Sequence, residues 1–287
     1  MQAEAETQVR AWVEYFRDLG VHDFYRRGEP AAVAPDQMQA SSATGFVAPG
    51  NGMQLQNELP NVSPISETIP LPSVNLISFN DLAPLPSAAI SPADRDTALH
   101  AIREEIGDCT RCPLAYAGRR KIVFADGTPT ARLMFVGEGP GADEDAQGLP
   151  FVGKAGQLLN NMIAAMGLAR TEVYIANIVK CRPPGNRVPE PLEANTCSPF
   201  LLRQIDVVQP EVIVALGSTA STYLLGVKQS LSSLRGRWHR CRGAKLAVTY
   251  HPAFLLRDPR QKPDAWKDLQ MVMAELGLAT PVPKNNA

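Results

Sequence analysis

A glycine-rich stretch that also carries several carboxylates is a place where chemistry can occur. Residues 137–156 read GEGPGADEDAQGLPFVGKAG. Glycines let a backbone approach a ligand closely, as they do in phosphate-binding loops. This stretch, however, also contains Glu138, Asp143, Glu144 and Asp145, and carboxylates repel phosphate. It therefore indicates a ligand-binding loop whose ligand is not simply the phosphates of a nucleotide.

The start of the chain and its hydropathy exclude several classes of protein. The N-terminal residues MQAEAETQVR lack the basic stretch and apolar core of a secretory signal. No apolar run approaches the roughly 20 residues that a helix needs to span a bilayer. The sequence therefore predicts a cytoplasmic protein with no membrane partner.

The spacing of the cysteines indicates a second site, which would hold a metal. Cys109 and Cys112 form a CxxC pair, and Cys181 and Cys197 follow later in the chain. Disulfides are rare in the cytoplasm, so we do not expect a disulfide framework. Four thiolates suit either a structural zinc ion or an iron–sulfur cluster, and spacing alone does not separate the two. We expect Cys241 to be a free thiol.

Charge is distributed unevenly along the chain. The net charge is −1, but residues 1–95 hold 11 acids and 5 bases, which leaves 18 acids and 23 bases in residues 96–287. The second segment therefore carries a net +5, against −6 for the first. A modest positive excess is compatible with a nucleic-acid partner.

The first 95 residues differ in composition from the rest. Apolar side chains between Val9 and Leu19 fall on one helical face, which predicts an amphipathic helix within residues 1–27. Residues 28–94 contain no Lys or Arg, and ten prolines lie between Pro30 and Pro92, so residues 28–95 are predicted to be a flexible linker. Its apolar patches, such as the one at residues 74–79, can act as docking motifs. Residues 1–95 thus have a possible protein partner.

From residue 96 onward the apolar pattern is regular and predicts one domain, residues 96–287. Short strand-like runs lie at residues 133–136, 173–179, 212–216 and 246–250, and helical patterns lie near residues 155–167, 191–208, 218–225 and 264–277. Alternating strands and helices predict an α/β fold, with a parallel sheet covered on both faces. Ligands bind at the carboxyl ends of such strands, where Glu138, Asn177 and His251 fall.

Three motifs together resemble the family 4 uracil-DNA glycosylases. They are the glycine-rich stretch of residues 137–156, NIVKCRPPGNR at 177–187 and HPAFLLR at 251–257, and the resemblance covers roughly residues 97–278. It implies a three-layer α/β/α sandwich with a central, mostly parallel sheet. It also implies a 4Fe–4S cluster, mainly structural, and hydrolysis of the bond between uracil and deoxyribose in DNA. The cluster ligands would be Cys109, Cys112, Cys181 and Cys197.

The resemblance assigns the glycine-rich loop to a uracil nucleotide that has been flipped out of the DNA. Asn177 would read the uracil edge and Phe151 would stack on the base. His251 would hydrogen-bond O2 as negative charge builds on the departing uracil. A side-chain amide can accept from uracil N3–H and donate to O4, whereas cytosine offers the opposite pattern.

The acidic residues have less definite roles. Glu138 would position or activate water, or stabilise positive charge on the sugar, and Glu144 would crowd uracil C5 and exclude thymine. Family 1 enzymes place a water-activating Asp where this chain has Gly139, so the base that activates water stays open. We expect Asp143 and Asp145 to be solvated.

Further positions are candidates for contact with the DNA around the uracil. Asn186 would lie near the nucleotide. Lys154, Arg187 and Arg257 would contact phosphates or wedge the strand, while Leu255 and Leu256 would enter the gap left by the flipped base. The alternative function is a non-catalytic DNA-binding or polymerase-associated module of the same fold. The combination of Glu138, Phe151, Asn177 and His251 favours the enzyme.

Overall fold

The computed structural model describes residues 78–279, all of which belong to one compact unit, Thr68–Ala287. The predicted helix within residues 1–27 and residues 28–77 of the predicted linker lie outside the described residues. No helix within the described range is both long and apolar enough to cross a bilayer.

The described part of the chain forms a six-stranded sheet in the order β1-β3-β2-β4-β6-β5. The four central strands, β3, β2, β4 and β6, run parallel, whereas β1 and β5 pair antiparallel at the two edges. The strands are β1 (Asp126–Gly127), β2 (Leu133–Gly137), β3 (Tyr174–Asn177), β4 (Val212–Leu216), β5 (His239–Cys241) and β6 (Ala244–Thr249). The prediction of a mostly parallel sheet is confirmed.

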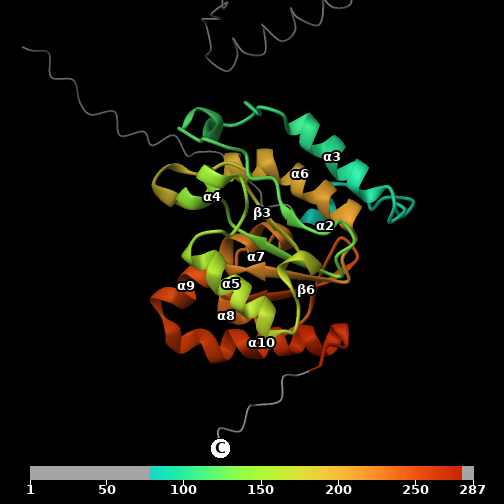
Figure 1. Cartoon of the computed structure of the whole chain (residues 1–287), viewed down its shortest axis with the longest axis vertical. Helices are drawn as coiled ribbons and strands as arrows, with labels where there is room; N and C mark the ends of the chain where they lie inside the picture. Colours follow the sequence, from blue (N-terminus) through green and yellow to red (C-terminus); the bar gives the residue numbers. More distant parts are fainter. Residues whose placement is uncertain (1–77, 280–287) are drawn as a thin grey trace, which may run out of the picture. The chain divides into compact units, whose positions relative to one another are not determined.

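Helices cover both faces of this sheet, and Figure 1 shows α10 on one side of the strands and α3 and α6 on the other. One face carries α2 (Phe79–Leu82), α3 (Arg95–Ile106), α6 (Pro191–Val208), α7 (Gly217–Leu225) and α8 (Leu231–Leu234). The other face carries α5 (Lys154–Ala165), α9 (Pro252–Arg257) and α10 (Lys262–Leu276). The short helix α4 (Ala142–Gln147) follows β2, and single 3₁₀ turns lie at Pro113–Tyr116, Arg170–Glu172, Pro184–Asn186 and Pro259–Gln261.

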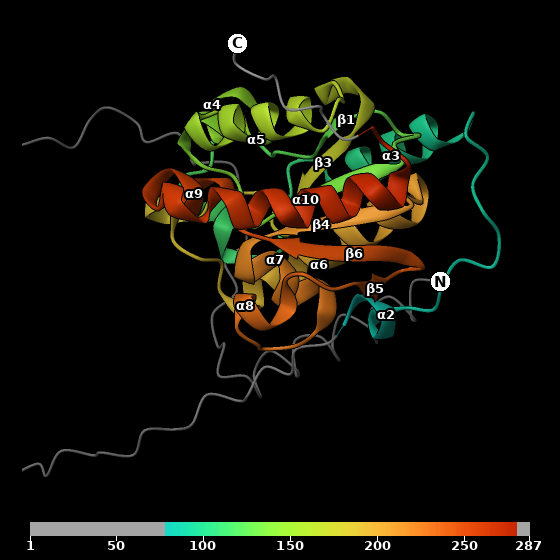
Figure 2. The ribbon, with the colours of Figure 1, turned by 90° about the horizontal axis from the view of Figure 1, so that it is seen from below.

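Alternate residues of each central strand belong to different hydrophobic cores. In β2, Met134 and Val136 pack with α3, α6 and α7, whereas Leu133 and Phe135 pack with α5 and α10. All five residues of β2 are buried, because helices cover both faces of the sheet. Figure 2 shows the strands between the helical layers. The structure thus has the predicted three-layer α/β/α arrangement.

Residues 79–84 pack against the domain, so the flexible linker predicted for residues 28–95 is wrong over this short part. Phe79 is 1% exposed and joins the core beneath α7. The guanidinium of Arg242 donates to the carbonyl oxygens of Phe79, Ala83 and Pro84. Asn80 accepts from the backbone N–H of Arg242 at 2.7 Å. These contacts join residues far apart in the chain, which composition cannot detect.

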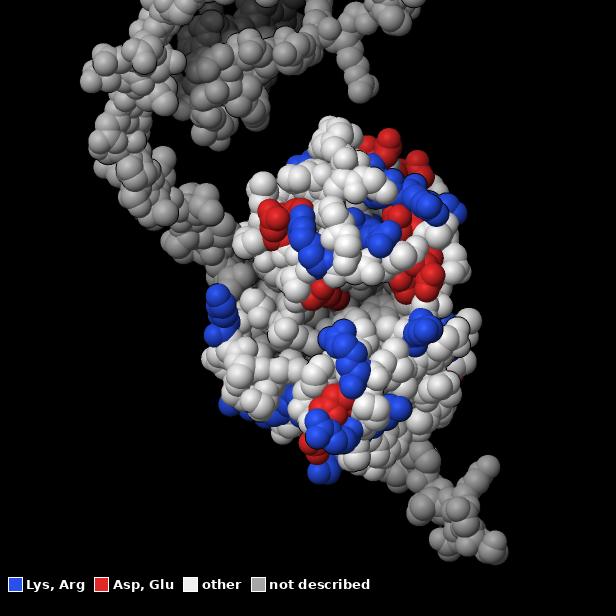
Figure 3. Space-filling model, turned by 90° about the vertical axis from the view of Figure 1, so that its left-hand side faces the viewer, with Lys and Arg blue, Asp and Glu red and all other residues white. Residues whose placement is uncertain are grey.

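The register of the sheet brings the ends of the central strands together. Gly137 at the end of β2 lies opposite Asn177 at the end of β3. Leu216 at the end of β4 lies opposite Thr249 at the end of β6. The segments that leave these four strands therefore meet at one edge of the sheet. Figure 3 shows a hollow on the face at this edge, bordered by both acidic and basic side chains.

Candidate active site

A cavity of about 760 Å³ opens at the carboxyl ends of the central strands. It is lined by the segments that follow β2, β3, β4 and β6. The lining includes most of the residues that the sequence singled out, namely Glu138, Gly139, Glu144, Phe151, Asn177, Asn186, Arg187, His251 and Arg257. Lys154, Leu255 and Leu256 are not among the lining residues. The topology thus gathers motifs that are more than a hundred residues apart.

Asn177 lies at the floor of the cavity with an unsatisfied acceptor. Its side chain is 1% exposed, and its Oδ1 atom has no hydrogen-bond partner among residues 78–279. A buried polar atom without a partner is rare, because desolvation is costly. Gly137 makes room for this side chain, since a Cβ there would lie 2.4 Å from Asn177 Oδ1 and 2.5 Å from Phe151 Cζ. The floor can therefore receive a hydrogen-bond donor.

Phe151 is held in a backbone conformation that a bulky residue rarely adopts. Its φ is 53°, in the left-handed region, and the residue is 5% exposed. Arg170 donates to the carbonyl oxygens of Phe151 at 3.1 Å and Pro150 at 2.6 Å. Gly156 has to be glycine, because a Cβ there would lie 1.9 Å from the Phe151 oxygen. These contacts hold the Phe151 ring at the cavity, 5.6 Å from the His251 ring.

His251 caps helix α9 and is neutral. Its Nδ1 atom accepts from the backbone N–H of Ala253 at 3.1 Å, so the ring proton lies on Nε2. Burial and, to a lesser degree, the positive charge of Arg257 lower the pKa of His251 to about 4, against the opposing effect of Glu144. A neutral imidazole with Nε2–H is a hydrogen-bond donor on the wall of the cavity.

Glu144 joins the two ends of the glycine-rich loop. One carboxylate oxygen accepts from the backbone N–H groups of Val152 at 2.9 Å and Gly153 at 3.0 Å. The other oxygen accepts from the N–H of Gly141 at 3.0 Å. The carboxylate to which the family resemblance gave a place beside uracil C5 therefore accepts hydrogen bonds from three backbone groups. It shapes the cavity wall by fixing the loop.

The other three carboxylates of the glycine-rich loop differ in exposure and in hydrogen-bond partners. Glu138 lines the cavity, and its Oε2 atom accepts from the hydroxyl of Thr219. Asp143 is exposed, as expected. The expectation that Asp145 is solvated is wrong: it is 1% exposed and accepts from the N–H groups of Arg120 at 2.8 Å and Lys121 at 3.3 Å. Its charge stabilises the turn before β1.

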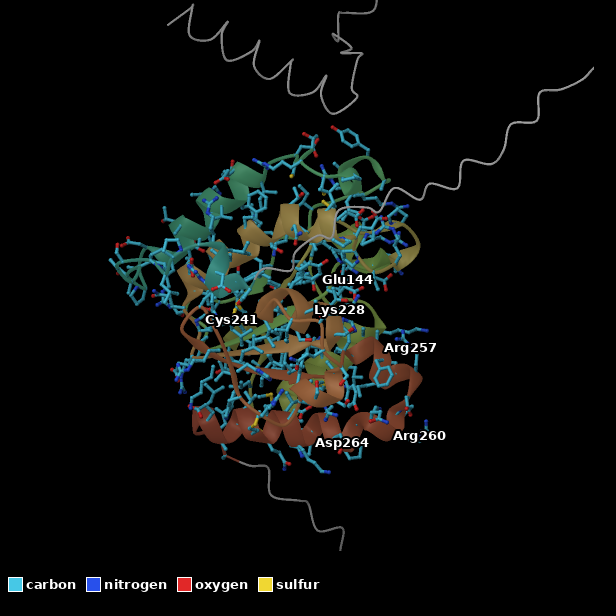
Figure 4. All side chains as sticks on the ribbon, turned by 180° about the vertical axis from the view of Figure 1, so that it is seen from behind. Glu144, Lys228, Cys241, Arg257, Arg260 and Asp264 are labelled. Carbon is cyan, nitrogen blue, oxygen red and sulfur yellow. The ribbon has the colours of Figure 1, made fainter. Side chains whose placement is uncertain are left out.

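The polar residues of the rim are partly committed to one another. Arg187 forms a bidentate pair with Glu193, at 2.8 and 2.7 Å. Asn186 accepts from Arg182 Nε at 2.7 Å. Arg257 is exposed and lines the cavity, and Figure 4 places it at the same edge of the molecule as Glu144. Arg257 is therefore better placed than Arg187 to bind an external anion.

The two leucines predicted to enter the DNA differ in exposure. Leu255 is 1% exposed and belongs to the core around α5 and α10, so it cannot enter a DNA gap in this arrangement. Leu256 is 44% exposed. Lys154, at the start of α5, is also exposed. Of these two leucines, Leu256 is therefore the one whose side chain can enter the gap left by a flipped base.

The four predicted ligand cysteines line one small pocket beside α3 and α6. Arg119 donates to Cys181 Sγ at 3.3 Å, Arg111 to Cys109 Sγ at 3.4 Å, and the backbone N–H of Lys180 to Cys197 Sγ at 3.3 Å. Donors aimed at sulfur are the surroundings that cysteine-ligated iron uses. The donor set therefore fits a metal group.

The four cysteines are not gathered around a single point in this structure. Within the described residues, no group of three or more His, Cys, Asp or Glu side chains is close enough to hold one metal ion. A tetrahedral zinc ion with bonds of about 2.3 Å would need its four sulfurs within about 4 Å of one another. An iron–sulfur cluster spreads its thiolates over several irons. Burial raises the pKa of Cys197 to about 12, so the bare thiol is protonated.

Several functional residues were missed in the sequence. Gly137 is the last residue of β2, and Thr219 lies shortly after β4. Ligands bind at the carboxyl ends of such strands, so their position in the sequence could have identified both residues. Lys180 is buried next to Cys181, and its ammonium donates to the backbone oxygen of Asn177 and to Gln204. A lysine gives no sequence signal of such burial.

A three-layer α/β/α domain with a cavity at the carboxyl ends of its parallel strands is typical of α/β enzymes. The family model described as the Uracil DNA glycosylase superfamily matches residues 124–270. The chain belongs to this superfamily.

Individual relatives place it more narrowly. The chain is 45% identical over 168 residues to the type-4 uracil-DNA glycosylase of Thermotoga maritima, covering 57% of this chain and 86% of the relative. It is 41% identical over 184 residues to the type-4 enzyme of Sulfurisphaera tokodaii, covering 61% of this chain and 83% of the relative. A DNA polymerase of Bacillus phage SP01 is 30% identical over 162 residues, covering 56% of this chain and 17% of the polymerase. The resemblance to the family 4 enzymes is confirmed.

Proposed function

We propose that the protein is a DNA-repair enzyme, a uracil-DNA glycosylase that hydrolyses the N-glycosidic bond of uracil in DNA and leaves an abasic site. The observation that carries this proposal is the buried Oδ1 of Asn177, which has no hydrogen-bond partner within residues 78–279 and lies at the floor of a cavity walled by Phe151 and His251. The relatives named type-4 uracil-DNA glycosylase support it.

Recognition of the base would take place at the floor of the cavity. Asn177 Oδ1 accepts the N3–H of uracil, and the amide nitrogen donates to O4. Cytosine has an acceptor at N3 and a donor at N4, so a fixed amide rejects it. The buried setting makes the discrimination strong, because a mismatched buried group costs about 1–3 kcal/mol. Phe151 stacks on the base and holds it in plane.

Bond cleavage leaves its electron pair on uracil N1, and the negative charge spreads to O2. The Nε2–H of the neutral His251 donates to O2 and stabilises this charge in the transition state. The sugar left behind is positively charged, and water attacks its C1′ atom. Glu138 lies at the cavity, where its carboxylate stabilises the sugar or accepts the proton of the water.

DNA has to present the uracil outside the base stack. Flipping a nucleotide costs a few kcal/mol, which contacts on the protein surface must offset. Leu256 is exposed next to the cavity and fills the vacated space, and Arg257 contacts the phosphates nearby. Lys154 and Asn186 are further candidates for contact with the strand.

We also propose that Cys109, Cys112, Cys181 and Cys197 hold a 4Fe–4S cluster. When bound, the cluster supplies a structural cross-link and no step of the hydrolysis. The cysteines come from the segment after α3, from the segment after β3 and from α6. Holding them together stabilises the loop that follows Asn177.

A direct assay tests the proposed function. Purified protein is incubated with end-labelled oligonucleotides that contain one uracil or one cytosine at the same position, and abasic sites are then cleaved with alkali. We expect strand cleavage and free uracil only with the uracil substrate. Asn177→Ala is the matched inactive control. Absence of free uracil with protein that carries its cluster would refute the function.

The match within a phage DNA polymerase favours a second candidate. The domain would then be a DNA-binding module that works next to a polymerase and does not cleave. Binding of uracil-containing DNA without any release of uracil would favour this candidate. Action in the cytoplasm, and a protein partner for residues 1–95, are further parts of the proposal.

A further inference from the structure

We propose that the ring of Phe254 is a second stacking surface, which takes the base next to the uracil in the same DNA strand. This inference rests on the proposed function. The inference adds a binding site for the neighbouring nucleotide. The residues of this site are not those proposed to contact the uracil or the reacting sugar.

The cavity is larger than a uracil needs. It measures about 760 Å³, whereas a molecule of liquid water occupies about 30 Å³, so the eight non-hydrogen atoms of uracil fill only part of this space. Beyond the residues that read the base, the lining continues over Leu231, Tyr250 and Phe254. The remaining space therefore has an aromatic wall.

Phe254 packs on the ring of Tyr250 at the edge of the second hydrophobic core, and both residues line the cavity. Its ring lies 5.1 Å from the ring of Tyr250, with 27° between the two planes. The guanidinium of Arg235 lies over the Tyr250 ring at 4.0 Å. Both Phe254 and Arg235 thus cover part of the Tyr250 ring. Phe254 is half-buried and lines the cavity, so part of its side chain is open to a ligand.

An ion pair fixes the base of the stack. Arg235 Nε donates to Asp268 at 2.7 Å, and the two side chains are only 12% and 4% exposed. Placing such a pair in the interior carries a desolvation cost, so its effect is on geometry more than on stability. It holds the guanidinium over the Tyr250 ring, and Tyr250 in turn contacts Phe254. A stack of fixed orientation presents a preformed surface to a base.

The position of the stack fits a neighbouring nucleotide. Tyr250 immediately precedes His251, and Phe254 lies on the helix that His251 caps. A flipped uracil that contacts His251 therefore lies close to Phe254. The base next to that uracil in the strand has lost a stacking partner, and the ring of Phe254 can replace it. Arg257 is exposed, lies on the same helix and lines the same cavity, where a phosphate between two nucleotides would meet it.

The test compares substrates that differ only in the neighbouring base. Single-turnover excision is measured as a function of enzyme concentration, on a single-stranded oligonucleotide with normal bases and on one with abasic spacers on both sides of the uracil. Phe254→Leu keeps an apolar side chain but removes the ring. Tyr116→Leu is the matched control, because Tyr116 is an exposed aromatic that does not line the cavity.

We expect Phe254→Leu to raise the half-saturating concentration about tenfold on the normal substrate, in line with loss of one stacked base, and to have no such effect on the spacer substrate. 2-Aminopurine placed on the 5′ or the 3′ side of a non-cleavable uracil analogue should be quenched on one side, and Phe254→Leu should relieve the quenching. Equal effects of Phe254→Leu on both substrates would overturn the inference. If the wild-type protein released no uracil at all, the proposed function would fail instead.

Discussion

The ammonium of Lys180 lies 2.9 Å from the carbonyl oxygen of Asn177. The same ammonium donates to the side-chain oxygen of Gln204 on α6 at 2.6 Å. Burial lowers the pKa of Lys180 to about 8, so it is still protonated at neutral pH. Lys180 thus ties Asn177, the proposed uracil-reading residue, to the helix that carries Cys197.

Replacement of this lysine should impair both the fold and base reading. In Lys180→Met, two buried acceptors lose their donor, at about 1–3 kcal/mol each. We expect a lower melting temperature and uracil excision reduced at least about tenfold. Lys267→Met is the control, because Lys267 is 73% exposed and pairs with Asp264 on the surface. Equal melting curves for the two variants would show that the Lys180 contacts contribute nothing.

His251 should make stability depend on pH. Its pKa lies near 4 in the folded chain and near 6.5 in the unfolded chain. Between these values the unfolded chain takes up a proton that the folded chain does not, so the free energy of unfolding falls as pH drops from 6.5 toward 4. His251→Asn keeps an acceptor for the Ala253 N–H and should lack this part of the pH dependence.

The same variant tests the role in catalysis. His251→Asn lacks the Nε2–H donor, so we expect excision at pH 7 to fall at least about tenfold. The exposed His100 provides a control, since His100→Asn should keep both the rate and the pH profile of the wild type. Unfolding curves from pH 4 to 8 that coincide for His251→Asn and wild type would contradict the assigned titration.

Asn177→Asp should reverse the hydrogen-bond preference of the floor. An ionised carboxylate accepts but does not donate, so uracil loses one bond and meets charge at O4. We expect uracil excision to fall at least about tenfold, and any cytosine excision to stay slow. Single-turnover assays on matched uracil and cytosine oligonucleotides measure both rates. An unchanged uracil rate would remove Asn177 from base recognition.

The N-terminal boundary of the folded domain can be found by truncation. Removal of residues 1–77 should leave excision within about tenfold of the full chain. Removal of residues 1–84 also takes away Phe79 and the carbonyls bound by Arg242. We expect it to lower the melting temperature by at least about 6 °C, from the roughly 3 kcal/mol of a lost core Phe.

Point variants in the full chain show which side chain accounts for the lower melting temperature of the shorter truncation product. Phe79→Ala should reproduce most of it, whereas Leu85→Ala should not, because Leu85 is 57% exposed. Equal melting temperatures for the two truncations would mean that residues 78–84 add no stability.

The four cysteines proposed as cluster ligands predict that the purified protein contains iron. Protein purified without oxygen should be brown and contain about four irons per chain. Cys109→Ser should lose iron, and Cys241→Ser should retain it, because Cys241 lies in β5 and does not line the cysteine pocket. One zinc per chain without iron would contradict the cluster.

The sequence predicted the parts of the fold that local pattern determines. The runs at residues 133–136 and 212–216 are buried on both faces, and their apolar composition identifies them as central strands. The edge strands β1 and β5 were missed, since two or three residues carry no periodicity. Motif position located Asn177, Phe151 and His251. It could not show that Asp145 is buried or that Leu255 faces the core, because both facts depend on contacts distant in the chain.

The three backbone N–H groups that Glu144 binds come from opposite ends of the glycine-rich loop. Because they share one carboxylate, Glu144 sets the separation of the two segments that carry them. The loop is thus closed on itself by a single side chain, without a disulfide or a metal ion. We therefore expect that replacing Glu144 would loosen the segments around Gly141 and Gly153 together.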